Sequence, residues 1–147
     1  MINEEILKFN KKDLLYYAGE KLGLKEFANI QIRNVKDALE KIAEAYFSET
    51  MGLIKVDRIN SKFLIVKIYN CATCSNSEKN EQMHCWFDAG YIAGALKAML
   101  KKDFIAFEVE CKAAGFEACK FIVTLKPTKR NLQKLFINLK PMDKMPF

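Results

Sequence analysis

The chain has few of the residues that break a protein into separate parts. All three of its prolines lie at or after residue 127, and glycine accounts for only six of the 147 residues. There is no internal repeat and no Pro/Gly/Ser-rich linker. No segment approaches the roughly 18 unbroken apolar residues of a membrane span, and the opening MINEEILKFNKKD lacks the apolar run of a signal peptide. These absences predict a single cytoplasmic domain, residues 1–147, long enough to bury a sizeable core.

Basic charge is scarce outside the C-terminal segment. The net charge is +6, but residues 126–147 hold six Lys or Arg against the single Asp143, so 18 basic and 17 acidic residues remain before them. A basic surface with interleaved aromatic residues, as nucleic-acid binding requires, is therefore not expected in this domain.

The hydrophobic pattern changes between helical and strand periods along the chain. Helices are expected over residues 12–24, 35–52 and 83–102, hairpins over 53–70 and 103–125, and a last helix after Pro127. Gly23 and Gly52 are expected to end the first two helices. The buried face of the second helix is predicted at Val35, Leu39, Ile42, Ala43 and Phe47, and that of the last at Leu132, Leu135, Phe136 and Leu139. This order predicts an α+β fold with an antiparallel sheet.

Cysteine is the residue type that carries the chemistry. The count of five is odd, and in a chain without a secretory signal clustered thiols indicate metal or redox chemistry more often than structural disulfides. Cys111 and Cys119 stand at the end of one expected strand and the start of its partner, within reach of one ion. Cys85 falls in the first turn of the expected helix, where backbone N–H groups favour a thiolate.

A fourth metal ligand is left open by the spacing alone. Glu108, His84, Cys71 and Cys74 are all candidates. The Cys-x-x-Cys pair at Cys71 and Cys74 resembles half of a zinc site, but it lies in an expected polar loop and the second pair has a longer spacing. The alternative for every cysteine is an ordinary place in the core as a small hydrophobic residue.

The run CWFDAGYIAGALKAMLKKDFIAFEVECKAAGFEACKFIV resembles the 4-vinyl reductase domain family, with the best match over residues 80–126. The resemblance carries a helix-start cysteine, G-Y-x-A-G, E-x-x-C and a cysteine eight residues later. It implies a fold similar to that of TRAPP trafficking subunits and a structural zinc ion. Its ligands would be Cys85, Glu108, Cys111 and Cys119, with Cys71 and Cys74 as a possible second thiol pair.

This implied ligand set makes a structural demand on the second hairpin. Residues three apart on an ideal strand, as Glu108 and Cys111 are, point to opposite faces. A bulge is therefore expected near Val109 and Glu110. Polar groups around the ligands are expected to offset their negative charge, and the candidates are His84, Lys112, Lys120 and the N–H groups of the helix. A closed shell of four protein ligands indicates a structural role for the ion.

The helix that follows Cys85 carries a strip of small residues, Gly90, Gly94 and Ala98, that is expected to pack against another element of the domain. On its other side, Cys85, Ala89, Ile92 and Leu96 are expected to face the second hairpin. The family resemblance implies an enclosed apolar pocket between this helix and the sheet. Candidate wall residues are Tyr91, Ile92, Ala95 and Ala106, each of which could equally be ordinary core.

The resemblance favours a small hydrophobic- or aromatic-ligand-binding or sensory module that signals as a homodimer or through a protein effector. The first alternative is a reductase of tetrapyrrole vinyl groups, but the chain lacks the G-x-G-x-x-G of a dinucleotide site, so enzyme activity is the weaker expectation. The second alternative is an interaction scaffold of the TRAPP type, which the cysteine set argues against.

Overall fold

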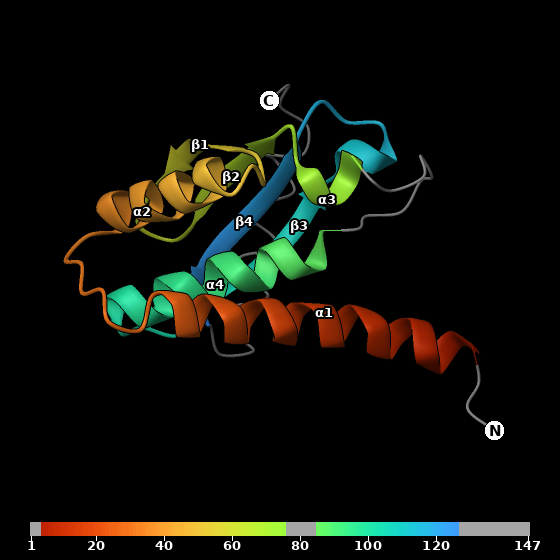
Figure 1. Ribbon diagram of the computed structural model, residues 1–147, viewed down its shortest axis with the longest axis horizontal. Helices are drawn as coiled ribbons and strands as arrows, with labels where there is room; N and C mark the ends of the chain where they lie inside the picture. Colours follow the sequence, from red (N-terminus) through yellow and green to blue (C-terminus); the bar gives the residue numbers. More distant parts are fainter. Residues whose placement is uncertain (1–3, 76–84, 127–147) are drawn as a thin grey trace.

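The computed structural model describes residues 4–75 and 85–126 (Figure 1). The helices are α1 (Glu4–Glu26), α2 (Val35–Ser48), α3 (Ala72–Ser75) and α4 (Trp86–Leu100), with a 3-10 turn at Lys112–Ala114. The strands are β1 (Leu53–Ile59), β2 (Leu64–Tyr69), β3 (Phe104–Glu110) and β4 (Cys119–Leu125). The predicted α+β class and both predicted hairpins are confirmed.

The four strands form one antiparallel sheet in the order β1-β2-β4-β3. The turn between β1 and β2 is closed by Asn60, whose side-chain oxygen accepts hydrogen bonds from the backbone N–H groups of Lys62 and Phe63 at 2.8 and 2.9 Å. The second hairpin turns at Gly115, which adopts a positive φ of 100°. Its two strands, β3 and β4, place the edge of the sheet beside the helices.

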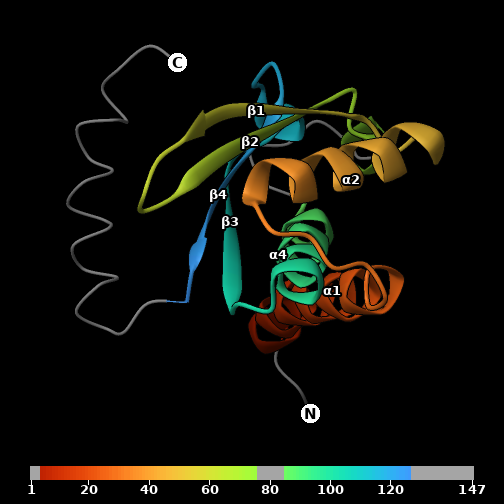
Figure 2. The same cartoon turned by 90° about the vertical axis from the view of Figure 1, so that its left-hand side faces the viewer.

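The described helices α1, α2 and α4 lie on one side of the sheet (Figure 2). Alternation along β2 explains how the sheet serves two faces: Leu64, Val66 and Ile68 join the main core with the helices, whereas Ile65 joins a small cluster with Phe63 and Ile122 on the other face. Helix α4 lies between α1 and the sheet, and every residue from Asp88 to Leu96 is buried. This central position accounts for its almost entirely apolar sequence.

Helices α1 and α4 cross at a distance that only glycine permits. A Cβ atom added to Gly90 would lie 2.0 Å from the carbonyl oxygen of Tyr16, and one added to Gly94 would lie 2.1 Å from that of Glu20. The predicted packing role of this strip is confirmed. The predicted helix end at Gly23 is wrong, because Gly23 lies inside α1 and faces the backbone of Tyr91, so its missing side chain serves the crossing instead of a turn.

Helix α2 differs from its prediction at the C-terminal end. It ends at Ser48, before Gly52, and its buried residues are Ala38, Leu39, Ile42 and Tyr46. The predicted core residue Phe47 is 72% exposed, whereas Tyr46 is 4% exposed. The difference arises because Tyr46 finds a buried hydrogen-bond partner on α4, which fixes the rotation of the helix.

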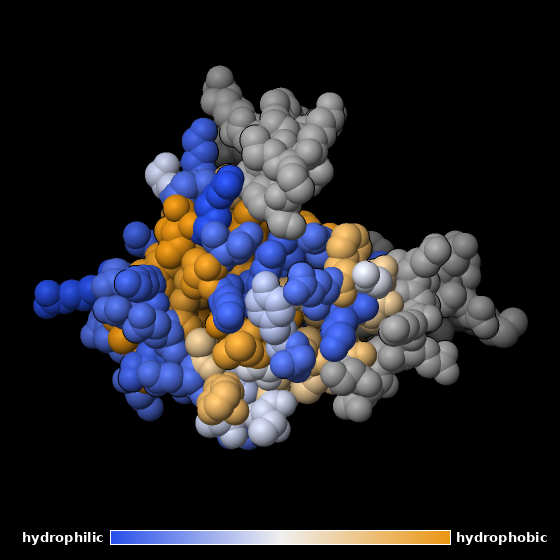
Figure 3. All heavy atoms as spheres, turned by 90° about the horizontal axis from the view of Figure 1, so that it is seen from above, coloured by the Kyte–Doolittle hydropathy of each residue, from blue (hydrophilic) through white to orange (hydrophobic). Residues whose placement is uncertain are grey.

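The face seen from above combines hydrophobic and charged side chains (Figure 3). Strand β1 lies at the top of Figure 1 and carries Leu53, Val56 and Ile59 as exposed large apolar residues. Among the described residues, no helix combines the length and the hydropathy that crossing a membrane requires. The helix predicted after Pro127, with its face of Leu132, Leu135, Phe136 and Leu139, lies outside the described residues.

Candidate metal centre and neighbouring pocket

All five cysteines are buried and free, and they gather where α3, the start of α4 and the open end of the second hairpin meet. Within this group, the sulfurs of Cys85, Cys111 and Cys119 form a triangle. Cys85 lies 4.0 Å from Cys111 and 3.6 Å from Cys119, and the last two are 4.0 Å apart. Two sets of four ligand atoms lie within 4.8 Å of one another: Cys85, Glu108, Cys111 and Cys119, and Cys71, Cys74, Cys85 and Cys119. The residues named by the family resemblance therefore come together.

The predicted bulge explains why Glu108 and Cys111 reach the same side of the sheet. Glu108 pairs with Phe121, but Glu110 pairs with Lys120, so β3 carries one extra residue between them. This residue shifts the alternation by one position and turns the end of β3 towards the buried cluster. The register shift is confirmed at the predicted place.

Cys85 occupies the N-cap of α4, one residue before the predicted first turn. Its carbonyl accepts the N–H of Ala89 at 3.1 Å, and its own N–H donates to Oε1 of Glu108 at 3.1 Å. The other carboxylate oxygen of Glu108, Oε2, has no hydrogen-bond partner among the described residues. Burial raises the pKa of Glu108 to about 7, although the N–H and thiol of Cys85 act in the opposite direction. A buried oxygen without a partner is what a metal ligand would offer.

Cys71 and Cys74 are not in a polar loop, as the sequence predicted. Both are buried, and Cys74 lies on α3, whose first N–H, from Ala72, donates to the carbonyl of Met51. The sulfur of Cys74 lies 3.0 Å from that of Cys85, 3.2 Å from Cys111 and 3.1 Å from Cys119. Hydrophobic contacts with the core outweigh the polar residues that flank the pair in the sequence.

The thiols share one negative charge more easily than several. Hydrogen bonds from Cys119, Cys71 and Cys85 lower the pKa of Cys74, while the same contacts raise the pKa of Cys85, whose thiol acts as a donor. The pKa of Cys119 is also raised, first by its contacts with Cys71 and Cys74. Ligation by several thiolates would therefore require a cation to displace protons.

The donor set fits a tetrahedral zinc site. Zn–S bonds of about 2.3 Å in a tetrahedron separate two sulfurs by about 3.8 Å, close to the three sides of the triangle. Among the predicted charge-balancing groups, the backbone N–H of Lys112 contributes a hydrogen bond that lowers the pKa of Cys119, and Lys120 forms an ion pair with Glu110 at 3.1 Å. His84, the remaining candidate, lies outside the described residues.

Beside this cluster, α4 is fixed by a second buried polar group. Asp88 is fully buried and accepts a hydrogen bond of 2.6 Å from the hydroxyl of Tyr46 on α2. Burial raises the pKa of Asp88, although the bonds from Tyr46 and Thr73 lower it. Burial also raises the pKa of Tyr46 well above its ordinary value, and the Asp88 charge adds to the shift. The pair joins α2 to α4 one helical turn after Cys85.

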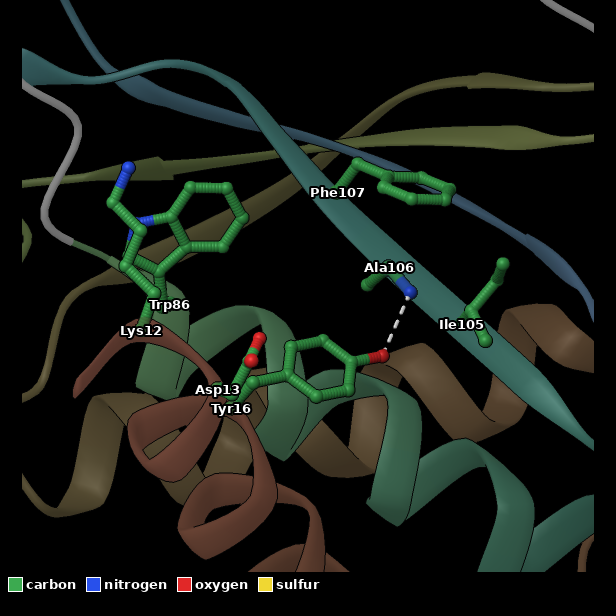
Figure 4. A pocket seen from close by; sticks show the side chains of 7 residues that line it. All are labelled: Lys12, Asp13, Tyr16, Trp86, Ile105, Ala106 and Phe107. Carbon is green, nitrogen blue, oxygen red and sulfur yellow. Dashed lines mark hydrogen bonds between the residues drawn. The ribbon is translucent and has the colours of Figure 1, made fainter. Parts of the chain in front are cut away.

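A mainly apolar pocket of about 450 Å³ lies between α1 and the edge strand β3 (Figure 4). It is lined by Lys12, Asp13, Tyr16, Trp86, Ile105, Ala106 and Phe107. The Tyr16 hydroxyl accepts the backbone N–H of Ala106 at 3.1 Å, which satisfies the free edge of β3. The indole N–H of Trp86 has no hydrogen-bond partner among the described residues, and the Lys12 ammonium lies 5.4 Å from the ring centre.

Of the four residues predicted to line a ligand pocket, Ala106 lines this one. Ile92 and Ala95 are fully buried in the core. Tyr91 is buried, and its hydroxyl donates to Glu26. Burial raises the pKa of Tyr91, and the bond to Glu26 adds to the shift.

The sequence prediction missed two groups of site residues. Lys12 and Tyr16 reach the pocket from α1, about 90 residues away from β3 in the sequence, and no local pattern could have indicated that. Trp86 could have been found, because it directly follows Cys85 and is the single tryptophan of the chain. The central position of Cys74 among the sulfurs depends on tertiary packing alone.

Residues 64–125 match the family model of the 4-vinyl reductase domain. The match begins 16 residues before the segment in which the resemblance was predicted to be best, and it includes all five cysteines. Among curated proteins, the chain is 34% identical over 112 residues to an uncharacterized protein of Methanocaldococcus jannaschii, MJ0745, and 27% identical over 113 residues to a second, MJ0150. The alignments cover 76% and 77% of this chain, but only 53% and 64% of those relatives.

Three solved structures share the fold. A vinyl-4-reductase family protein from Methanocaldococcus jannaschii aligns with a TM-score of 0.63 and 23% identity, over 84% of this chain and 77% of that one. The phenol-responsive sensory domain of the transcription activator PoxR, solved with phenol, aligns with a TM-score of 0.67 and 15% identity, over 85% and 70%. Trafficking protein particle complex subunit 3 from Naegleria fowleri, covalently bound to palmitic acid, gives 0.65 and 20%, over 84% and 88%. The predicted likeness to both groups is confirmed at the level of the fold.

Proposed function

Because this chain carries a 4-vinyl reductase domain, we propose that it is a small-molecule-binding or sensory module with a structural zinc site beside an apolar pocket. The observation that carries the proposal is the adjacency of Cys85 and Trp86. One residue belongs to the thiol cluster and the next lines the pocket. The cluster that fixes the start of α4 therefore also fixes one wall of the pocket.

The zinc ligands we propose are Cys85, Glu108, Cys111 and Cys119. Support comes from the mutual reach of their ligand atoms, the sulfur separations, and the Oε2 atom of Glu108, which lacks a partner among the described residues. With all four positions filled by protein, the ion would have no site for water or substrate. Its role would be to tie the start of α4 to both strands of the second hairpin.

The occupant we propose for the pocket is a small apolar or aromatic molecule. The volume is within the range of small-molecule sites. The walls offer aromatic surface from Trp86, Tyr16 and Phe107, and the indole N–H could donate to a polar group on the ligand. One protein of the same fold is described with phenol and another with palmitic acid, which supports an apolar ligand without choosing between a ring and a chain.

The test uses Trp86 as a built-in reporter, since it is the only tryptophan of the chain. Titration with phenol, and separately with palmitate, should change the tryptophan emission in a saturable manner for at least one probe. Ala106→Leu, which fills the pocket, should weaken that response about tenfold or more, whereas Val56→Leu on the far edge strand β1 should not. Absence of saturable binding by both probes would contradict the proposed ligand class.

Any signal would pass to another protein. We propose a homodimer or a protein effector as the receiver, supported by the exposed apolar residues of β1. Native mass spectrometry of the titrated sample reports the oligomeric state together with retained metal and ligand.

A further inference from the structure

We propose that Cys74 is a fifth metal ligand that exchanges with Glu108 for the fourth coordination position, so that one site has two closed forms. One form would hold the ion by three thiolates and a carboxylate, and the other by four thiolates. The inference rests on the proposed zinc site, and it assigns to Cys74 a role that the predicted ligand set leaves out.

The position of Cys74 is the first argument. Its sulfur lies 3.0, 3.2 and 3.1 Å from the three sulfurs of Cys85, Cys111 and Cys119, so it stands over the triangle as the fourth corner of a tetrahedron. These three distances are shorter than the about 3.8 Å edge of a zinc–thiolate tetrahedron. An outward shift of less than about 1 Å would give Cys74 the ligand geometry.

The local structure permits such a shift. Cys74 lies on the one-turn helix α3, which is attached to the fold through the Ala72 N–H and the Met51 carbonyl. Glu108, by contrast, lies within strand β3 and is oriented by the N–H of Cys85. The carboxylate would remain hydrogen-bonded through Oε1 whether or not its other oxygen binds the ion.

Charge and softness decide what the exchange would change. A thiolate and a carboxylate each contribute one negative charge, so the total charge around the ion is the same in both forms. The donor atoms differ in softness, because sulfur favours thiophilic ions and oxygen favours harder ones. The form with Cys74 should therefore be favoured by a softer ion such as Cd²⁺, while Zn²⁺ tolerates both donors.

The experiment measures zinc bound to purified variants after equilibration with a calibrated chelator. Glu108→Gln and Cys74→Ser should each retain about one zinc per chain, because the other residue supplies the fourth ligand. The double variant should lose at least about tenfold in zinc affinity relative to either single variant. The matched control is Glu108→Gln with Cys71→Ser, which should keep its zinc because Cys74 is intact.

A second readout does not depend on removing the carboxylate. The Cd²⁺–thiolate charge-transfer absorbance grows with the number of coordinated sulfurs, so Cys74→Ser should lower it by about a quarter, and Cys71→Ser should leave it unchanged. Circular dichroism of each variant checks that the fold is retained.

Each outcome assigns the fault to one claim. If wild type binds zinc but Glu108→Gln loses it as completely as the double variant, the exchange is wrong and the proposed zinc site stands. An unchanged cadmium signal in Cys74→Ser, or an equal loss in Cys71→Ser, also overturns the role of Cys74. A wild-type chain that binds neither ion overturns the exchange and the zinc site together.

Discussion

The crossing of α1 and α4 and the thiol cluster both bring distant segments into close contact, but by opposite means. At the crossing, glycines remove side chains so that one backbone lies directly against another. At the cluster, five buried sulfurs are brought together, several of them closer than a coordinated tetrahedron would hold them. Both features position the same helix, α4, one along its middle and the other at its start.

This comparison separates two sources of stability. The crossing consists of atoms of the chain alone, so its contribution is present whenever the protein is folded. The cluster gathers groups whose charges repel one another when ionised, and it becomes stabilising when a cation binds them. Variants in the two regions should therefore respond differently to added metal.

The largest expected effect is that of Cys119→Ser at the cluster. Zinc binding contributes on the order of 10 kcal/mol in small structural sites, and Cys119 belongs to both possible ligand sets. The variant should lose most of its bound zinc and several kcal/mol of zinc-loaded stability. Thermal unfolding with and without a chelator measures this difference. Full metal content in the variant, together with an unchanged melting temperature, would show that Cys119 is not a ligand.

Gly90→Ala at the crossing should have the next largest effect, independent of metal. The added Cβ would lie 2.0 Å from the Tyr16 carbonyl oxygen, so the helices must separate and lose packing. We expect a loss of about 3 kcal/mol or more in the free energy of unfolding, equal with and without chelator.

The control for this variant is Gly115→Ala in the second hairpin. Its Cβ would meet no atom within 4 Å, and only the positive φ of 100° opposes it, so the cost should be about 1 kcal/mol. Equal losses in the two alanine variants would show that close helix packing does not govern the crossing.

The smallest effect concerns Asp88, which lies on α4 between the two regions. Because the folded protein raises its pKa, the folded state holds the proton more tightly, and the stability that protonated Asp88 contributes is lost as pH rises above the unfolded value of about 3.9. Asp88→Asn, which can still accept from Tyr46, should gain stability relative to wild type as pH rises. Urea unfolding at several pH values measures this; a stability difference independent of pH would contradict the raised pKa.

Much of the fold follows from local patterns, and the errors have identifiable causes. The two hairpins and the bulge beyond Glu108 are predictable because strand alternation is a local property of the chain. The end of α1 is misplaced at Gly23, since a glycine that stops a helix and one that admits a neighbouring helix look alike in a sequence. Hydrophobicity ranks Phe47 above Tyr46 as a core residue, whereas the buried bond to Asp88 decides the rotation of α2.

The candidate site divides in the same way. The cysteines with regular spacing around the hairpin, together with Glu108, can be recognised from the sequence through the family resemblance. Cys74 and the α1 side of the pocket cannot, because their neighbours are contributed by segments far away in the chain.

The sequence by itself determined the order of helices and hairpins, the shortage of turn residues within them, and the set of thiols available to bind an ion. These properties depend on backbone preferences and on residue chemistry, which neighbouring residues reveal. Only the tertiary structure decided which thiol stands over the other three and which helix closes the pocket, because those contacts result from how α1, α3 and α4 pack against one sheet.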